Sequence, residues 1–176
     1  GGFLTGSRPA PRIPPDDLDR KLGSFIVRRP LDAIRRWFRF TAAPGSAARL
    51  ETTNGQVQAN NFDSSLSCDV VNGSIELTGC AGPVHATTVN GGLRIAFRGP
   101  LKRSELETVN GSVEVAFDRA SSIRYDLETV NGRIEGDIEL AVEGKHGPKE
   151  ARGSYNGGSE SLHCETVNGS IRLKTR

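Results

Sequence analysis

Carboxylates recur at two fixed positions ahead of the Asn-Gly pair of a repeated sequence unit. They stand three residues before the Asn at Glu51, Asp69, Glu107, Glu128 and Glu165, and five residues before it at Glu105 and Asp126. If the repeats stack and the segment between the last two loops out, an acidic patch forms from Glu105, Glu107, Asp126, Glu128 and Glu165. Like charges about 5 Å apart repel one another. Such a patch therefore suits a divalent cation or a basic partner, and the alternative is a solvated acidic face.

Other chemistry-bearing residues do not form a catalytic pattern in the sequence. The sequence contains no Gly-rich phosphate loop, no Cys/His metal spacing and no serine nucleophile elbow. His85 and His163 share the position five residues before Asn, and we interpret them as surface side chains of well-separated coils. We therefore predict a protein that is not an enzyme, with no catalytic residue and no cofactor, and we assign no confident metal ligands.

The three cysteines do not provide an even disulfide framework. Cys68 and Cys164 both lie four residues before an Asn, where other repeats have Leu or Ala, so we interpret them as small buried hydrophobic residues. Several coils would separate these two cysteines. A Cys68–Cys80 bridge within one coil is the only pairing left open.

The repeated unit consists of an apolar residue, an acidic residue or Thr, Thr-Val-Asn-Gly or a close variant, and an apolar-polar-apolar triplet. The successive Asn-Gly pairs are 18, 18, 20, 21 and 37 residues apart. Because Asn and Gly tolerate tight turns, each pair predicts a corner. The corner residues are Asn54, Asn72, Asn90, Asn110, Asn131 and Asn168.

Alternation of apolar and polar residues on both sides of each corner predicts strands with one buried face. One predicted core column contains Val57, Ile75, Leu93, Val113, Ile134 and Ile171, and a second contains Ala59, Leu77, Ile95, Val115 and Leu173. Side-chain amides can donate and accept along a stack, so identical Asn residues favour parallel coils over a meander. The fold class predicted is all-β: a single-stranded parallel β-helix (β-solenoid) of about six to seven short coils.

Charge divides the chain into two parts. Residues 1–49 contain ten Arg/Lys against four Asp, whereas residues 50–176 contain 13 basic and 17 acidic residues. We predict a disordered or extended leader at 1–15, a basic amphipathic and partly helical cap at 16–39, and a solenoid at 40–176 with a surface insertion at 143–160. Residues 20–39 also permit contact with a membrane.

From about Phe40 to Arg176 the sequence resembles the bacterial Toastrack family, an adhesin-like β-strand-repeat family of unknown function. The resemblance rests on the segments ETVNGSVEVAF, ETVNGRIEGDIELAVEG and ETVNGSIRL, on the lead-in APGSAARLETTNGQV, and on the Gly-rich insertion Gly153–Ser159. It implies a β-helical, non-catalytic module of the cell envelope or cell surface. The basic stretch before Phe40 is not part of the family pattern.

We therefore expect an interaction or scaffold module of the cell envelope, periplasmic or at the cell surface. The chain begins Gly-Gly and has no Met, so we expect a native N-terminal segment, such as a membrane tether, to be missing. The expected partner is a protein or envelope component, and we expect no nucleic acid. The alternatives are a self-assembling, bactofilin-like polymer joined through the solenoid ends and a carbohydrate-active β-helix enzyme.

Overall fold

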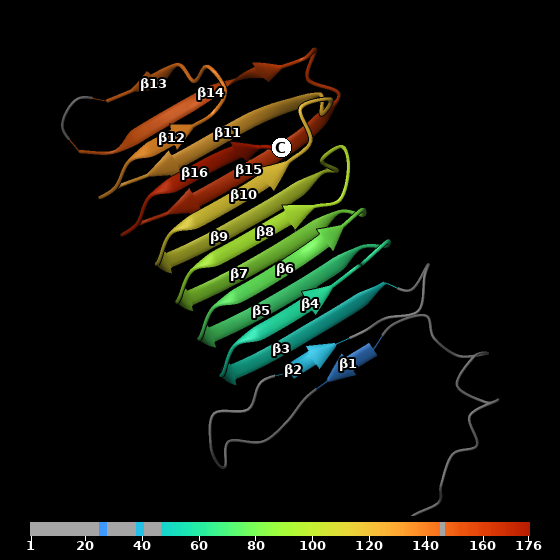
Figure 1. The fold of residues 1–176 in the computed structure, drawn as a ribbon. Helices are drawn as coiled ribbons and strands as arrows, with labels where there is room; N and C mark the ends of the chain where they lie inside the picture. The colour runs from blue at the N-terminus through green and yellow to red at the C-terminus, as the bar shows by residue number, and fades with distance from the viewer. Residues whose placement is uncertain (1–24, 28–37, 41–46, 145–146) are drawn as a thin grey trace, which may run out of the picture.

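The computed structural model describes residues 25–27, 38–40, 47–144 and 147–176, and all regular elements in this part of the chain are strands. They form two sheets whose inward side chains make one continuous hydrophobic core (Figure 1). In spatial order, the nine-stranded sheet contains β1 (Phe25–Val27), β3 (Ala48–Asn54), β5 (Leu66–Asn72), β7 (Val84–Asn90), β9 (Ser104–Asn110), β15 (Glu160–Thr166), β11 (Ile123–Thr129), β14 (Lys149–Tyr155) and β13 (Val142–Glu143). The seven-stranded sheet contains β12 (Ile134–Gly136), β16 (Ile171–Thr175), β10 (Val113–Phe117), β8 (Leu93–Phe97), β6 (Ile75–Cys80), β4 (Val57–Asn60) and β2 (Phe38–Phe40).

Each repeat makes one coil of the predicted β-solenoid. A strand in the nine-stranded sheet runs toward the Asn-Gly corner, and a second strand then runs back in the seven-stranded sheet. Neighbouring coils pair in parallel with equivalent positions in register, for example Leu50 with Cys68 and Val57 with Ile75. The prediction of a parallel solenoid is confirmed, and every residue of the two predicted core columns is buried.

The corners are held by an Asn ladder that runs the length of the described solenoid. Asn54 accepts at one end of the ladder, and the Nδ2 of each of the other five corner Asn residues donates to the Oδ1 of the Asn in a neighbouring coil, at 2.8 to 3.1 Å. Beneath the ladder, the hydroxyl of Thr108 donates to the carbonyl oxygen of Gly91 at 2.9 Å, and Thr88, Thr129 and Thr166 make equivalent bonds. Buried polar side chains of the repeat therefore have partners, as buried polar groups require.

The coils do not stack in the order of the sequence. The C-terminal strand β15 lies between β9 and β11, and β16 lies between β10 and β12, so the last coil is inserted between the two coils that precede it in the chain. Figure 1 shows these C-terminal strands enclosed within the stack. The 37-residue step between the last two repeats therefore includes a path out and back around the end of the solenoid.

This end of the solenoid is covered by the segment between the last two repeats. Residues 143–160, expected to form a surface excursion, include β14, which pairs antiparallel with β11 along all seven residues of each strand. Ile138 is buried in the core, and Leu140 packs against it. The segment thus extends the nine-stranded sheet and covers the edge of β11, which would otherwise be open.

The N-terminal prediction requires a correction. Within the predicted cap, Phe25–Val27 forms strand β1, which pairs with β3. Strand β2 (Phe38–Phe40) spans the boundary between the predicted cap and the solenoid and pairs with β4. A partly helical cap is not supported, because these residues continue the parallel ladders of the solenoid. The leader at 1–15 and the remainder of 16–39 lie outside the described residues. In the described part of the chain, no helix has the length and apolar character needed to cross a membrane.

Candidate functional site

Two outward columns on the nine-stranded sheet carry the predicted acidic residues. Strand register places equivalent repeat positions side by side, so the columns run across the strands along the solenoid axis. The column five residues before Asn reads Arg49, Ser67, His85, Glu105, His163, Asp126 and, on the antiparallel strand, Arg152. The column three residues before Asn reads Glu51, Asp69, Thr87, Glu107, Glu165, Glu128 and Glu150.

Arginines neutralise the two ends of this face. Arg49 lies 2.7 Å from a carboxylate oxygen of Glu51 and 3.1 Å from one of Asp69. At the other end Arg152 donates to Asp126 at 3.0 Å and to Glu128 at 2.8 Å, and it also pairs with Glu150. These contacts, with the Asp126 hydrogen bond as the largest cause, raise the pKa of the Arg152 guanidinium. Its positive charge fills the space between carboxylates that could otherwise hold a cation.

Insertion of the last coil has opposite electrostatic effects on the two sheets. On the seven-stranded sheet it places Arg172 between Glu114 and Glu135, and Arg172 donates to Glu135 at 3.0 Å. The column four residues after Asn therefore alternates in sign as Glu76, Arg94, Glu114, Arg172 and Glu135. On the nine-stranded sheet the same insertion places Glu165 directly between Glu107 and Glu128, which brings three like charges together.

Glu107 and Glu165 are the uncompensated members of that row. Glu128 pairs with Arg152, but within the described ranges neither Glu107 nor Glu165 has an ion-pairing partner. Directly opposed like charges on neighbouring strands destabilise a sheet. The fold thus tolerates a local cost here that it avoids on the opposite sheet.

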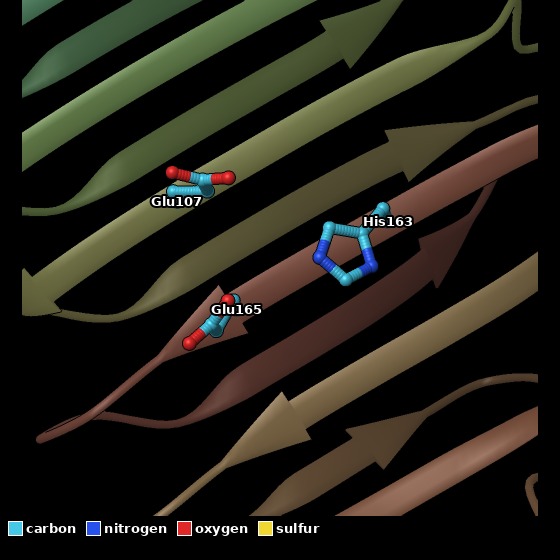
Figure 2. Close-up of side chains that lie close together, drawn as sticks. All are labelled: Glu107, His163 and Glu165. Carbon is cyan, nitrogen blue, oxygen red and sulfur yellow. The ribbon is translucent and has the colours of Figure 1, made fainter.

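His163 lies beside this uncompensated pair. Figure 2 shows His163 and Glu165 on one strand, β15, and Glu107 on the neighbouring strand β9. One ligand atom from each of Glu107, His163 and Glu165 lies within 4.8 Å of the others. The Nδ1 atom of His163 is 3.9 Å from Oδ2 of Asp126, so the ring has a carboxylate on its Nδ1 side. Two carboxylates and one imidazole thus converge at the surface of the sheet.

The five predicted acidic residues do not form one site. Glu105 pairs with Nδ1 of His85 at 3.3 Å, and Asp126 and Glu128 belong to the Arg152 cluster. Only Glu107 and Glu165 remain next to each other without a cation. The predicted patch is contiguous in the structure, but its charges are divided among three sets of partners.

Sequence reasoning missed His163 as a neighbour of the glutamates. Stacking the repeats in chain order separates His85 and His163 by several coils, whereas in the structure only β9 lies between their strands. One sequence feature could have indicated this contact: His163 and Glu105 both stand five residues before their Asn, and their coils are neighbours in the structure. Arg152 and Glu150 were also missed, because their strand β14 does not carry the repeat.

The cysteines contribute no reactive thiol to this surface. Cys68, Cys80 and Cys164 are all free and buried, so the Cys68–Cys80 bridge left open by the sequence is not formed. Burial raises the pKa of Cys80 to about 12 and raises the pKa of Cys68 and of Cys164 as well. A thiol that remains protonated is a poor nucleophile, so these residues act as core side chains.

Comparison with known proteins identifies the repeat. A family model described as Toastrack DUF4097 matches residues 39–174. Among curated proteins, none matches the chain significantly. A solved structure from Clostridium sporogenes, described as a "putative cell adhesion protein", is similar at 16% identity and a TM-score of 0.38; the match covers 74% of this chain and spans 55% of that protein's length. The match to the family model covers most of the chain, including all six Asn-Gly repeats, and the chain therefore belongs to the Toastrack family.

Proposed function

We propose that this chain is a non-enzymatic interaction module of the bacterial cell envelope, and that it recognises its partner through the outer face of the nine-stranded sheet. The observation that carries the proposal is the adjacent, uncompensated pair Glu107 and Glu165 on a surface where the neighbouring carboxylates are paired with arginine or histidine. Charged groups that a fold leaves unpaired are available for recognition.

The rest of the described solenoid supports a scaffolding role. Inward side chains pack the core, Asn and Thr side chains satisfy the corners, and no buried side-chain polar atom among the described residues lacks a partner. This arrangement presents the outer face on a regular parallel sheet. A site on regular strands is held more firmly than one on loops.

The pairing of β14 along the edge of β11 favours a discrete module over the polymer alternative. Strand β14 pairs with β11 in the antiparallel sense, and Ile138 packs into the core at this end. Parallel stacking of another molecule on β11 would require displacement of β14. The enzyme alternative gains no support from the two carboxylate clusters, since one of them holds the guanidinium of Arg152.

The test is saturable binding of the purified chain to isolated cell envelopes of the organism that encodes it. Co-sedimentation at increasing protein concentration should reach a plateau, and added salt should weaken the binding because the recognising groups are exposed charges. An unlabelled copy of the chain should displace a labelled one. Co-sedimentation that never saturates, or that matches the level of an unrelated acidic protein, would reject the proposal.

A further inference from the structure

We infer that Glu107, His163 and Glu165 form a binding site for a divalent first-row transition metal ion, with Zn²⁺ as the best-suited example. Their ligand atoms lie within 4.8 Å of one another and come from two neighbouring strands, β9 and β15. Zinc binds imidazole nitrogen and carboxylate oxygen at about 2.0 to 2.2 Å. Side-chain rotations that move each donor atom by about 1 Å would bring all three donors to that distance from one ion.

The imidazole determines the class of metal. Ca²⁺ and Mg²⁺ prefer sites built from oxygen ligands, with six or more ligands in total. An imidazole with two carboxylates instead suits Zn²⁺ and its transition-metal neighbours. The site therefore differs in chemistry from a general acidic patch, in which every ligand would be an oxygen.

A second carboxylate, that of Asp126, lies beside the His163 ring. Asp126 lies on the Nδ1 side of the ring at 3.9 Å, which leaves Nε2 for the side of the glutamates. A hydrogen bond from its far nitrogen to a carboxylate orients a ligating histidine. At 3.9 Å the Asp126 contact is longer than a hydrogen bond, so Asp126 would have to approach the ring to play this part. Asp126 is itself paired with Arg152 at 3.0 Å.

A second cluster on the same face provides an internal comparison. Asp126, Glu128 and Glu150 also lie within 4.8 Å of one another, but the guanidinium of Arg152 contacts all three. The fold supplies a built-in cation to that carboxylate cluster. It supplies none from the described residues to Glu107 and Glu165, where a metal ion would relieve the repulsion between the two.

The site needs the inserted C-terminal coil. His163 and Glu165 lie on β15, and Glu107 lies on β9, 56 residues earlier in sequence than His163. Three protein ligands at the surface leave a coordination position open to water or to a donor from a partner, as in zinc sites with three protein ligands. The metal site shares Glu107 and Glu165 with the proposed recognition face, but Zn²⁺ binding can be measured without the envelope partner.

The experiment is a Zn²⁺ titration of the metal-stripped full chain, without a polyhistidine tag, in competition with a chromogenic chelator. We expect one Zn²⁺ per chain. His163→Ala and Glu165→Gln should each weaken binding by about tenfold or more. The matched control is His85→Ala, because His85 occupies the same column but faces Glu105; its affinity should equal that of the wild type.

Substitution of Co²⁺ gives a second readout, since its visible absorption reports the nitrogen and oxygen ligands directly. Circular dichroism shows that each variant is folded, and Glu107→Gln repeats the test on the other strand. Binding at about 100 μM Zn²⁺ or below supports the site. It is overturned by no binding at that concentration, by binding that His163→Ala leaves unchanged, by equal losses in His163→Ala and His85→Ala, or by Ca²⁺ binding as tightly as Zn²⁺.

Discussion

Asn168 donates its side-chain amide to Oδ1 of Asn110 at 2.8 Å, although 58 residues of sequence separate the two. On the other side, the side-chain amide of Asn131 donates to Oδ1 of Asn168 at 2.9 Å. The last coil is therefore not an end cap but an interior layer, bonded on both sides by the ladder that joins the other coils. Because of this placement, Glu165 and His163 become neighbours of Glu107.

Removal of an interior ladder residue should cost more than removal of a terminal one. Asn110 donates to Asn90 and accepts from Asn168, whereas Asn131 makes one ladder bond among the described residues. Each net hydrogen bond contributes about 0.5 to 1.5 kcal/mol. Urea unfolding should therefore show a larger loss of stability for Asn110→Ala than for Asn131→Ala. Equal losses would mean that the ladder does not contribute bond by bond.

The corner glycines should tolerate no side chain where the neighbouring coil approaches. A Cβ at Gly111 would lie 1.9 Å from the carbonyl oxygen of Gly91, while a Cβ at Gly99 would meet nothing within 4 Å. Overpacking of this kind costs about 1 to 3 kcal/mol or more. We expect Gly111→Ala to lower the unfolding free energy by at least about 2 kcal/mol and Gly99→Ala to leave it nearly unchanged. Denaturant titration of both variants checks this, and a fully stable Gly111→Ala would contradict the close coil packing.

Neutralising Glu165 should stabilise the metal-free protein. Glu165 is in register with Glu107 and Glu128, and directly opposed like charges cost a few tenths to about 1 kcal/mol. Thermal unfolding of Glu165→Gln in chelator and low salt should occur at a higher temperature than that of the wild type, and added salt should reduce the difference. Glu135→Gln is the control, since it removes an ion pair with Arg172 and should not stabilise. A destabilised Glu165→Gln would argue against uncompensated repulsion.

Stability should depend on pH through Glu114. A hydrogen bond from Lys174 at 2.9 Å, aided by Arg94 and Arg172, lowers the pKa of Glu114 in the folded protein. The stabilisation is therefore present above the unfolded-state pKa of about 4.3 and is lost as the pH falls through the lower folded-state value. For this partly exposed pair we expect a difference of at most about 1 kcal/mol between wild type and Glu114→Gln at pH 7.

Urea unfolding as a function of pH measures that difference, which should shrink below about pH 4.3. Glu139→Gln serves as the control, because the Glu139 side chain is exposed and forms no ion pair within the described ranges. A wild-type advantage over Glu114→Gln that stays constant down to acid pH would show that ionisation of Glu114 is not its source.

Much of the fold could be predicted from the repeat itself. Alternation of residues identified both core columns, and the fixed phase of Asn identified the ladder, because each depends only on neighbours within a coil or on identical positions in adjacent coils. The spatial order of the coils could not be predicted. A 37-residue step is compatible with a loop that continues the stack or with one that returns around its end, and the repeat is the same in both.

The repeat also predicted part of the candidate site. The column of Glu107, Glu128 and Glu165 follows from phase alone, and its contiguity follows once the last coil is adjacent. The compensation by Arg152 could not be foreseen, because β14 lacks the repeat and pairs antiparallel. The helical interpretation of 16–39 was wrong for strands β1 and β2. Helix-capping residues and apolar spacing indicate a helix locally, but the edges of β3 and β4 offer backbone hydrogen-bond partners that favour strands.

Paired charge reversals distinguish the outer face of the nine-stranded sheet from the opposite sheet as the surface that recognises the partner. Glu107→Lys/Glu165→Lys changes that face, and Glu76→Lys/Glu135→Lys makes the same change in net charge on the seven-stranded sheet. In the envelope-binding assay, we expect affinity to fall about tenfold or more for the first variant and to change little for the second. Equal effects of the two variants, or a loss confined to the second, would contradict it.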